Sequence, residues 1–172
     1  RIGRHAKSSS LLAGLIADAA GNALIATHAN KRGKRYRYYI SKALHEGRTR
    51  GRLGRDHLVS LDAEGCANWR LPATDIETIV IRELLALLTS PTRVLALAGA
   101  LQSDRPLSIP ERATIVSAAK AIAADLIGPD GAAARGRILE LLSRIEVAPD
   151  GLTIRFNLAG TAAALGVEGG AS

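Results

Sequence analysis

The chain has 172 residues, 47% of them hydrophobic, which is enough to bury the core of one or two small domains. It contains one cysteine and no apolar run of the ~20 residues that span a bilayer, so we expect neither a disulfide framework nor membrane insertion. A reducing, cytoplasmic setting is the default expectation. The chain opens on Arg1 and contains no methionine, so we expect it to be the tail of a longer protein.

The net charge of +7 is unevenly distributed. Residues 1–57 hold thirteen Lys/Arg against three Asp/Glu, a balance of +10, whereas residues 58–172 hold ten against thirteen, a balance of −3. The densest stretch is THANKRGKRYRYYIS, residues 27–41, which contains five Lys/Arg, all three tyrosines and no acid. Cations can bind phosphates, and aromatic rings can contact sugars and base edges. The first part of the chain is therefore predicted to meet a nucleic acid, and the second to pack or to meet protein.

Three short apolar or alternating segments predict the strands of a small antiparallel ribbon. Gly21 and Gly33 lie in the polar turns between them, where a positive φ is favourable. In the last strand, alternation places Tyr36, Tyr38 and Ile40 on one face and the residues between them on the other, so that one face can pack and the other can bind. The predicted strands cover residues 11–17, 23–27 and 35–40.

Two basic segments flank this ribbon. Residues 1–10 are polar and aperiodic, and we expect a basic linker. The segment after the ribbon separates its arginines with glycines, which favours a mobile basic loop over a charged helix. The alternative for this segment is a merely solvated loop. Its arginines are Arg48, Arg50, Arg52 and Arg55.

From residue 71 onward the apolar spacing becomes that of helices. Thr74 and Glu77 have the spacing of a capping box, which predicts the start of the first helix. Alternation near the end predicts a β-hairpin with its turn at Pro149–Gly151. The sequence therefore predicts an α+β fold, a small antiparallel β-ribbon followed by a helical region and a C-terminal β-hairpin. The predicted domains are 1–10 (linker), 11–70 (ribbon), 71–158 (helices and hairpin) and 159–172 (flexible tail).

No catalytic or cofactor motif is visible in the sequence. The four histidines lack the i, i+4 spacing of a helical zinc pair, and they are His5, His28, His45 and His57. The acidic pair Asp75 and Glu77 is explained by helix capping. We therefore expect no catalytic residue, no bound metal and no cofactor in this chain.

Several segments, in this order, resemble the C-terminal region of large serine recombinases. They are LLAGLI, DAAGN, KRGKRYRYYIS, CANWRLPATDIE and RILELLSRIEV with LTIRF, and they extend from about Leu11 to Phe156. The resemblance implies a zinc ribbon followed by helices, lying after a separate catalytic domain whose serine attacks a DNA phosphate. It also implies that this region grips the outer part of a recombination site. Family members carry a coiled coil for subunit contacts, but no sustained heptad is visible here, which leaves self-association on paired sites open.

The resemblance also implies a change at the zinc site. The four cysteine positions of the family correspond here to Asp18, Gly21, Ser41 and Cys66. One thiolate with an aspartate and a serine is a poor zinc site, so a degenerate, metal-free ribbon is expected. Such a ribbon would be held by packing of Leu12, Leu15, Ile16, Tyr38 and Ile40.

Duplex DNA is therefore the expected partner. Arg32 or Arg35 could read guanine, while the remaining cations would bind phosphates. Asn30 could read adenine, although turn geometry explains this residue equally well. The tyrosines are expected to lie more often in the core than on bases. Two alternatives stay open, an RNA-binding module and a protein-interaction module that oligomerises or docks an acidic partner. The expected main contacts are Lys31, Arg32, Lys34, Arg35 and Arg37, and the secondary contacts are Arg48, Arg50, Arg52 and Arg55.

Overall fold

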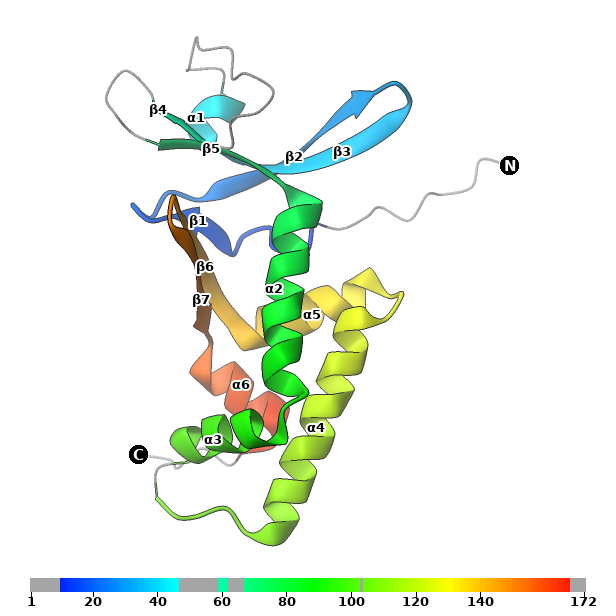
Figure 1. Ribbon diagram of the computed structural model, residues 1–172, viewed down its shortest axis with the longest axis vertical. Coiled ribbons are helices and arrows are strands. Elements are labelled where there is room, and N and C mark those ends of the chain that lie inside the picture. The colour runs from blue at the N-terminus through cyan, green and yellow to red at the C-terminus, as the bar shows by residue number, and fades with distance from the viewer. Residues whose placement is uncertain (1–9, 47–58, 62–66, 103, 168–172) are drawn as a thin grey trace. The chain divides into compact units, whose positions relative to one another are not determined.

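The computed structural model describes residues 10–46, 59–61, 67–102 and 104–167 (Figure 1). Within these ranges two small β-sheets combine with α-helices, so the predicted α+β fold class is confirmed. The strands are β1 (Ile16–Asp18), β2 (Leu24–Lys31), β3 (Lys34–Ser41), β4 (Val59–Leu61), β5 (Ala67–Pro72), β6 (Leu142–Ala148) and β7 (Gly151–Phe156). The helices are α1 (Lys42–His45), α2 (Ala73–Leu88), α3 (Pro91–Leu101), α4 (Ile109–Ile127), α5 (Gly131–Leu141) and α6 (Leu158–Leu165).

The chain divides into two compact units. The sheet unit consists of the described residues of Leu12–Ile79 and Arg144–Arg155, and the helical unit of those of Arg1–Leu11, Val80–Ser143 and Phe156–Ser172. This division differs from the predicted boundary after residue 70, because the hairpin near the C-terminus belongs to the sheet unit. Strand β6 brings it there by pairing with β1.

The larger sheet has the strand order β2-β3-β5-β4, with β2 antiparallel to β3 and β5 antiparallel to both of its neighbours. Lys31 pairs with Lys34, so the β2–β3 hairpin is closed by the two residues Arg32 and Gly33. Both have a positive φ, 50° and 74°, as in the type I′ turn that matches the twist of a hairpin. Two of the three predicted ribbon strands therefore form a hairpin with a charged turn, shown in blue in Figure 1, whereas the first predicted strand belongs to the other sheet.

The smaller sheet has the order β1-β6-β7, and β1 runs parallel to β6. The predicted first strand over residues 11–17 is corrected here, because the chain turns through residues 11–15 and only then forms β1. The amide of Ile145 donates to the carbonyl of Leu15, and the amide of Ala19 donates to the carbonyl of Val147. The pairing of β1 with β6 joins residues that are far apart in the chain, so no local pattern in the sequence predicts it. The alternation within β6 and β7 is a local pattern, and it does predict these two strands.

The core of the sheet unit is centred on Tyr39, which is fully buried. Leu12 and Ile16 are buried as predicted, but Tyr38 and Ile40 are only half-buried. The face of β3 that carries Tyr39 is therefore the more deeply packed face, and on the other face Tyr36 is exposed while Tyr38 and Ile40 are half-buried. Other buried side chains of this unit are Leu24, Trp69, Leu71, Ala73, Ile76, Ile145 and Val147.

The helical unit begins its helices with local capping signals. Ser108 and Glu111 form a reciprocal capping box at the start of α4. The Arg105 guanidinium, and then the Ser108 hydroxyl and amide, hold the pKa of Glu111 at about 2.

Among the described residues no single helix is long and apolar enough to cross a membrane. Helices α2 and α3 reach the required length and hydrophobicity only when taken together, and the pair is bent by 84°.

Helix α6 (Leu158–Leu165) occupies the first part of the predicted flexible tail, whereas residues 168–172 lie outside the described residues. The Asn157 side chain accepts from the amide of Gly160 at 3.1 Å, and Gly166 ends the helix with φ 71°. A Cβ at Gly160 would lie 2.1 Å from the carbonyl oxygen of Glu140, so only glycine allows α6 to approach the end of α5 this closely. Asn157 and Gly166 are residue types that favour the start and the end of a helix, although the small, glycine-rich composition of this segment suggested that it would fray.

Candidate nucleic-acid interface

The tip of the β2–β3 hairpin carries a cluster of cations, which we call the tip cluster: Lys31, Arg32, Lys34 and Arg35. All four residues are exposed, and Lys31 lies directly opposite Lys34. Like charges opposite each other destabilise a hairpin, and no Asp or Glu lies between residues 19 and 45 to relieve them. None of the ion pairs in the described residues includes a member of the cluster. The cluster therefore has the charge to bind a polyanion.

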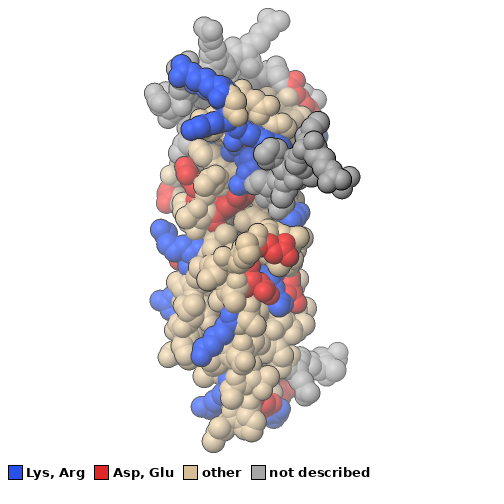
Figure 2. All heavy atoms as spheres, turned by 90° about the vertical axis from the view of Figure 1, so that its right-hand side faces the viewer, with Lys and Arg blue, Asp and Glu red and all other residues tan. Residues whose placement is uncertain are grey.

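Figure 2 shows the same feature on the surface. In this view, blue Lys and Arg side chains gather in the upper part, where the hairpin lies. Asn30 pairs with Arg35 in the strand register, and it is exposed beside the tip cluster, as a base contact would require. Its predicted part in DNA recognition stays a prediction.

Arg32 has an uncommon backbone conformation. It is the one non-glycine residue at positive φ among the described residues. The first position of a type I′ turn favours Asn, Asp or Gly, and a side chain without local hydrogen bonding to the turn costs about 1–2 kcal/mol there. The turn conformation alone therefore does not explain why this position holds an arginine. The guanidinium of Arg32 is the part of the residue that another role would require.

The base of the hairpin contains a different arrangement, which we call the Glu77 network. The guanidinium of Arg37 donates to both carboxylate oxygens of Glu77, at 3.0 and 2.9 Å. The hydroxyl of Tyr39 donates to Glu77 Oε1 at 2.7 Å and accepts from the amide of Leu12 at 2.9 Å. Burial, and then the hydrogen bond to Glu77, raise the pKa of Tyr39 above its ordinary value. The network connects β3 to α2 and to the turn that precedes β1.

Two predictions are affected by this network. Arg37 was expected to be a main DNA contact, but its charge is paired with Glu77 and its side chain is only 18% exposed. Glu77 was expected to cap α2 with Thr74, but its carboxylate binds the hairpin and the residue is 5% exposed. Thr74 and Glu77 do have the i, i+3 spacing of a capping box, but the carboxylate of Glu77 binds Arg37, which lies forty residues away in the sequence.

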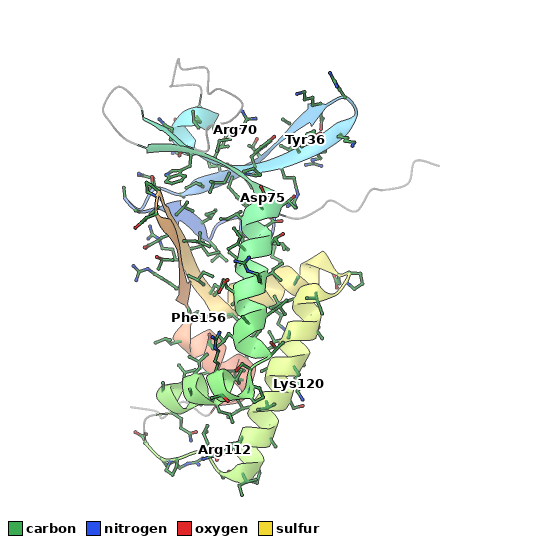
Figure 3. All side chains as sticks on the ribbon, in the orientation of Figure 1. Tyr36, Arg70, Asp75, Arg112, Lys120 and Phe156 are labelled. Atoms are coloured by element: carbon green, nitrogen blue, oxygen red, sulfur yellow. The ribbon has the colours of Figure 1, made fainter. Side chains whose placement is uncertain are left out.

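The outer face of the larger sheet adds aromatic side chains to the cations of the tip. Tyr36 is 44% exposed, and the guanidinium of Arg70 lies 4.5 Å from the centre of the Tyr38 ring. Figure 3 shows Tyr36 on the hairpin and Arg70 on the neighbouring strand β5. The expectation that tyrosines belong to the core therefore holds for Tyr39 and not for Tyr36. Sequence reasoning missed Arg70, because nothing in the stretch NWRLP marks it as a neighbour of Tyr38.

Two of the four positions that the sequence resemblance matches to zinc-binding cysteines are held by hydrogen bonds. Both carboxylate oxygens of Asp18 accept from Asn22, from its amide at 2.8 Å and from its side chain at 3.0 Å. The hydroxyl of Ser41 accepts from the amide of Trp69 at 2.7 Å. Among the described residues no group of three His, Cys, Asp or Glu could hold a metal. Polar contacts thus join packing in stabilising the ribbon, and Cys66 lies outside the described residues.

Several predicted contacts cannot be placed. Residues 47–58 lie outside the described part of the chain, and so do the basic residues of the predicted linker. The predicted secondary contacts concerned are Arg48, Arg50, Arg52 and Arg55. They remain predictions from the charge pattern alone.

Comparison with known proteins yields no match to a protein-family model and none to a curated protein. One solved structure, a complex of an LSR (large serine recombinase) with DNA, is similar to this chain with a TM-score of 0.43 and 16% sequence identity. The similarity covers 88% of this chain and 56% of the other, so the chain spans little more than half the length of that protein.

Proposed function

We propose that this chain is the DNA-binding, non-catalytic C-terminal region of a site-specific serine recombinase, acting in the cytoplasm. It grips the recombination site while a separate catalytic domain of the same protein integrates, excises or inverts DNA. The observation that carries the DNA-binding part is the tip cluster, four exposed cations at the end of a two-stranded hairpin without an acid beside them. The recombinase part rests on the sequence resemblance from about Leu11 to Phe156.

The shape of the hairpin supports duplex DNA as the partner. A two-stranded β-ribbon fits the major groove, which is about 12 Å wide. At the tip, Lys31 and Lys34 reach phosphates on either side, and Arg32 projects from the turn toward base edges, where arginine is the usual partner of guanine. Arg35 and Asn30 follow on the next pair of positions. The same ribbon therefore provides phosphate anchors and candidates for base recognition.

The salt dependence of binding tests this proposal. Each neutralised phosphate contributes about −0.9 to the slope of log Kobs against log salt concentration, so four tip cations predict a slope of about −4 or steeper. Affinity for a labelled mixed-sequence duplex should then fall roughly 100-fold between 50 and 200 mM salt. Fluorescence anisotropy of the full chain measures this slope. A slope near zero would contradict DNA binding by the tip cluster.

RNA is the second candidate, because the exposed ring of Tyr36 could stack on an unpaired base. Competition between the labelled duplex and unlabelled single-stranded RNA, at one salt concentration, separates the two. We expect an unlabelled duplex of equal length to displace the labelled duplex more effectively than the single-stranded RNA does. Preference for RNA would replace the recombinase proposal, and preference for an acidic protein over both would indicate a protein-interaction module.

A further inference from the structure

A line of side chains crosses the outer face of the larger sheet from the hairpin tip to β5. Alternation along β3 places Lys34, Tyr36 and Tyr38 on one face. Arg70 pairs with Ile40 in the register, so its side chain belongs to the same face and lies diagonally next to Tyr38. The face therefore presents a cation, two aromatic rings and a second cation in sequence.

Arg70 stacks on a ring, and no described acidic residue pairs with its charge. Its guanidinium lies over the Tyr38 ring at 4.5 Å, and within the described residues it takes part in no ion pair or hydrogen bond. A guanidinium stacked on a ring keeps its N–H groups at the edge of the plane, where they can donate to two oxygens of one phosphate. Stacking also reduces the side-chain freedom that binding would otherwise cost.

The spacing along the sheet fits a duplex that is entered by the tip. Tyr38 lies four residues from Lys34, which is about 13 Å of extended strand. The major groove is about 8.5 Å deep, so when the tip reaches the base edges the guanidinium over Tyr38 lies a few ångströms beyond the rim. The phosphates of the backbone line that rim. Tyr36, between the two cations, then faces the sugar-phosphate wall of the groove.

We propose that Arg70 is an additional DNA-contacting residue, which binds a backbone phosphate at the rim of the groove, and that Tyr38 is its positioning residue. The inference rests on the proposed function, and it extends the DNA contact from the hairpin to the third strand of the sheet. Arg70 and Tyr38 would set how far the hairpin inserts, because the rim contact forms only at one depth.

Neutralising Arg70 tests the contact. Arg70→Gln should make the salt slope about 0.9 less negative and weaken binding of the mixed-sequence duplex about fivefold to tenfold at 100 mM salt. The matched control is Arg93→Gln, which removes the same charge from an exposed position on α3 in the helical unit and should leave the slope unchanged. Thermal melting of each variant checks that the fold is intact.

Tyr38 provides the test of positioning. Tyr38→Phe keeps the ring and should bind like the wild type, whereas Tyr38→Leu removes the platform and should weaken binding about threefold although every cation remains. If Arg70→Gln leaves slope and affinity unchanged, or if Arg93→Gln has the same effect as Arg70→Gln, the inference is wrong and the proposed function stands. If the wild type itself binds duplex without salt dependence, the proposed function fails first.

Discussion

The tip and the base of the β2–β3 hairpin carry the same kinds of residue and use them differently. At the tip, Lys34 and Arg35 are exposed and have no acidic partner among the described residues. At the base, Arg37 is held by both oxygens of a buried carboxylate, beside the fully buried Tyr39. Arg35 and Arg37 lie on the same face of one strand, two residues apart. The difference shows that a basic stretch can combine a binding cluster with a structural ion pair.

The comparison also explains how the hairpin can present its tip. A two-stranded hairpin alone is marginally stable in water, and the like charges of the tip cluster weaken it further. The Glu77 network attaches the base of β3 to α2, and β5 pairs along the other side of β3. The base therefore supplies the rigidity that a charged, acid-free tip cannot provide for itself.

The largest effect on stability is expected at Glu77. Glu77→Gln leaves the Arg37 guanidinium partly buried without its counter-charge, which should lower the free energy of unfolding by about 3 kcal/mol. Glu83→Gln, in the same helix, removes a carboxylate from the exposed pair with Arg82 and should cost less than about 0.5 kcal/mol. Urea denaturation measures both. Equal losses would mean that the network contributes no more than a surface pair.

The two arginines on the same face of β3 should separate binding from stability. Arg37→Gln should lower the free energy of unfolding by about 2 kcal/mol, because Glu77 stays buried, and should leave the salt slope unchanged. Arg35→Gln should do the opposite, with a salt slope about 0.9 less negative and a stability change within about 0.5 kcal/mol. Melting curves and duplex titrations of the two variants provide the comparison. A reduced slope in intact Arg37→Gln would support the prediction from the sequence that Arg37 contacts DNA.

The phenol of Tyr39 makes the network sensitive to alkaline pH. Its pKa is raised in the folded state, so the folded chain holds the proton more tightly than the unfolded chain, whose tyrosine titrates near pH 10. The stabilisation is therefore fully present below about pH 10 and is lost as the pH rises toward the folded-state pKa, at up to about 1.4 kcal/mol per pH unit. Tyr39→Phe should be about 1 kcal/mol less stable at pH 8, and the difference from the wild type should shrink above pH 10. A constant difference would contradict this assignment.

The smallest effect is expected at the turn. Arg32→Asn suits the type I′ conformation better and should raise the free energy of unfolding by about 0.5–1 kcal/mol, while it weakens duplex binding. Lys31→Asn removes the same charge from a residue that lies in the strand, so it should weaken binding without a comparable gain in stability. Denaturation and anisotropy distinguish the two. If Arg32→Asn binds the duplex with unchanged affinity, the arginine at this turn position does not serve DNA binding.

Local patterns in the sequence were enough to predict the hairpin and its tip cluster. Gly33 marks the turn, and charged residues beside a hairpin turn lie beyond the packed part of the strands, so the exposure of Lys34 and Arg35 follows from their position next to the turn. Assigning which face packs requires knowing what lies against it. Tyr39 is buried because residues near Leu12 and Glu77 meet it, and both are distant along the chain.

Non-local pairing accounts for the other differences. The parallel partner of β1 comes more than a hundred residues later, so the sequence suggested a longer, purely local strand there. Glu77 fits a capping box by its spacing from Thr74, and only the fold shows its carboxylate on Arg37 instead. The position of Arg70 over Tyr38, on which its proposed role rests, comes from the register of β5 against β3, which no motif in its own stretch specifies.

The most direct test of the account compares two variants that each lose four cations. One replaces the tip cluster, Lys31, Arg32, Lys34 and Arg35, with glutamine, and the other replaces the exposed cations of the helical unit, Arg82, Arg93, Arg112 and Lys120. Duplex titrations over a range of salt concentrations should show the slope of the tip variant reduced in magnitude by about 3–4 and that of the helical variant unchanged. A tip variant that stays folded and keeps the slope of the wild type would contradict the central claim.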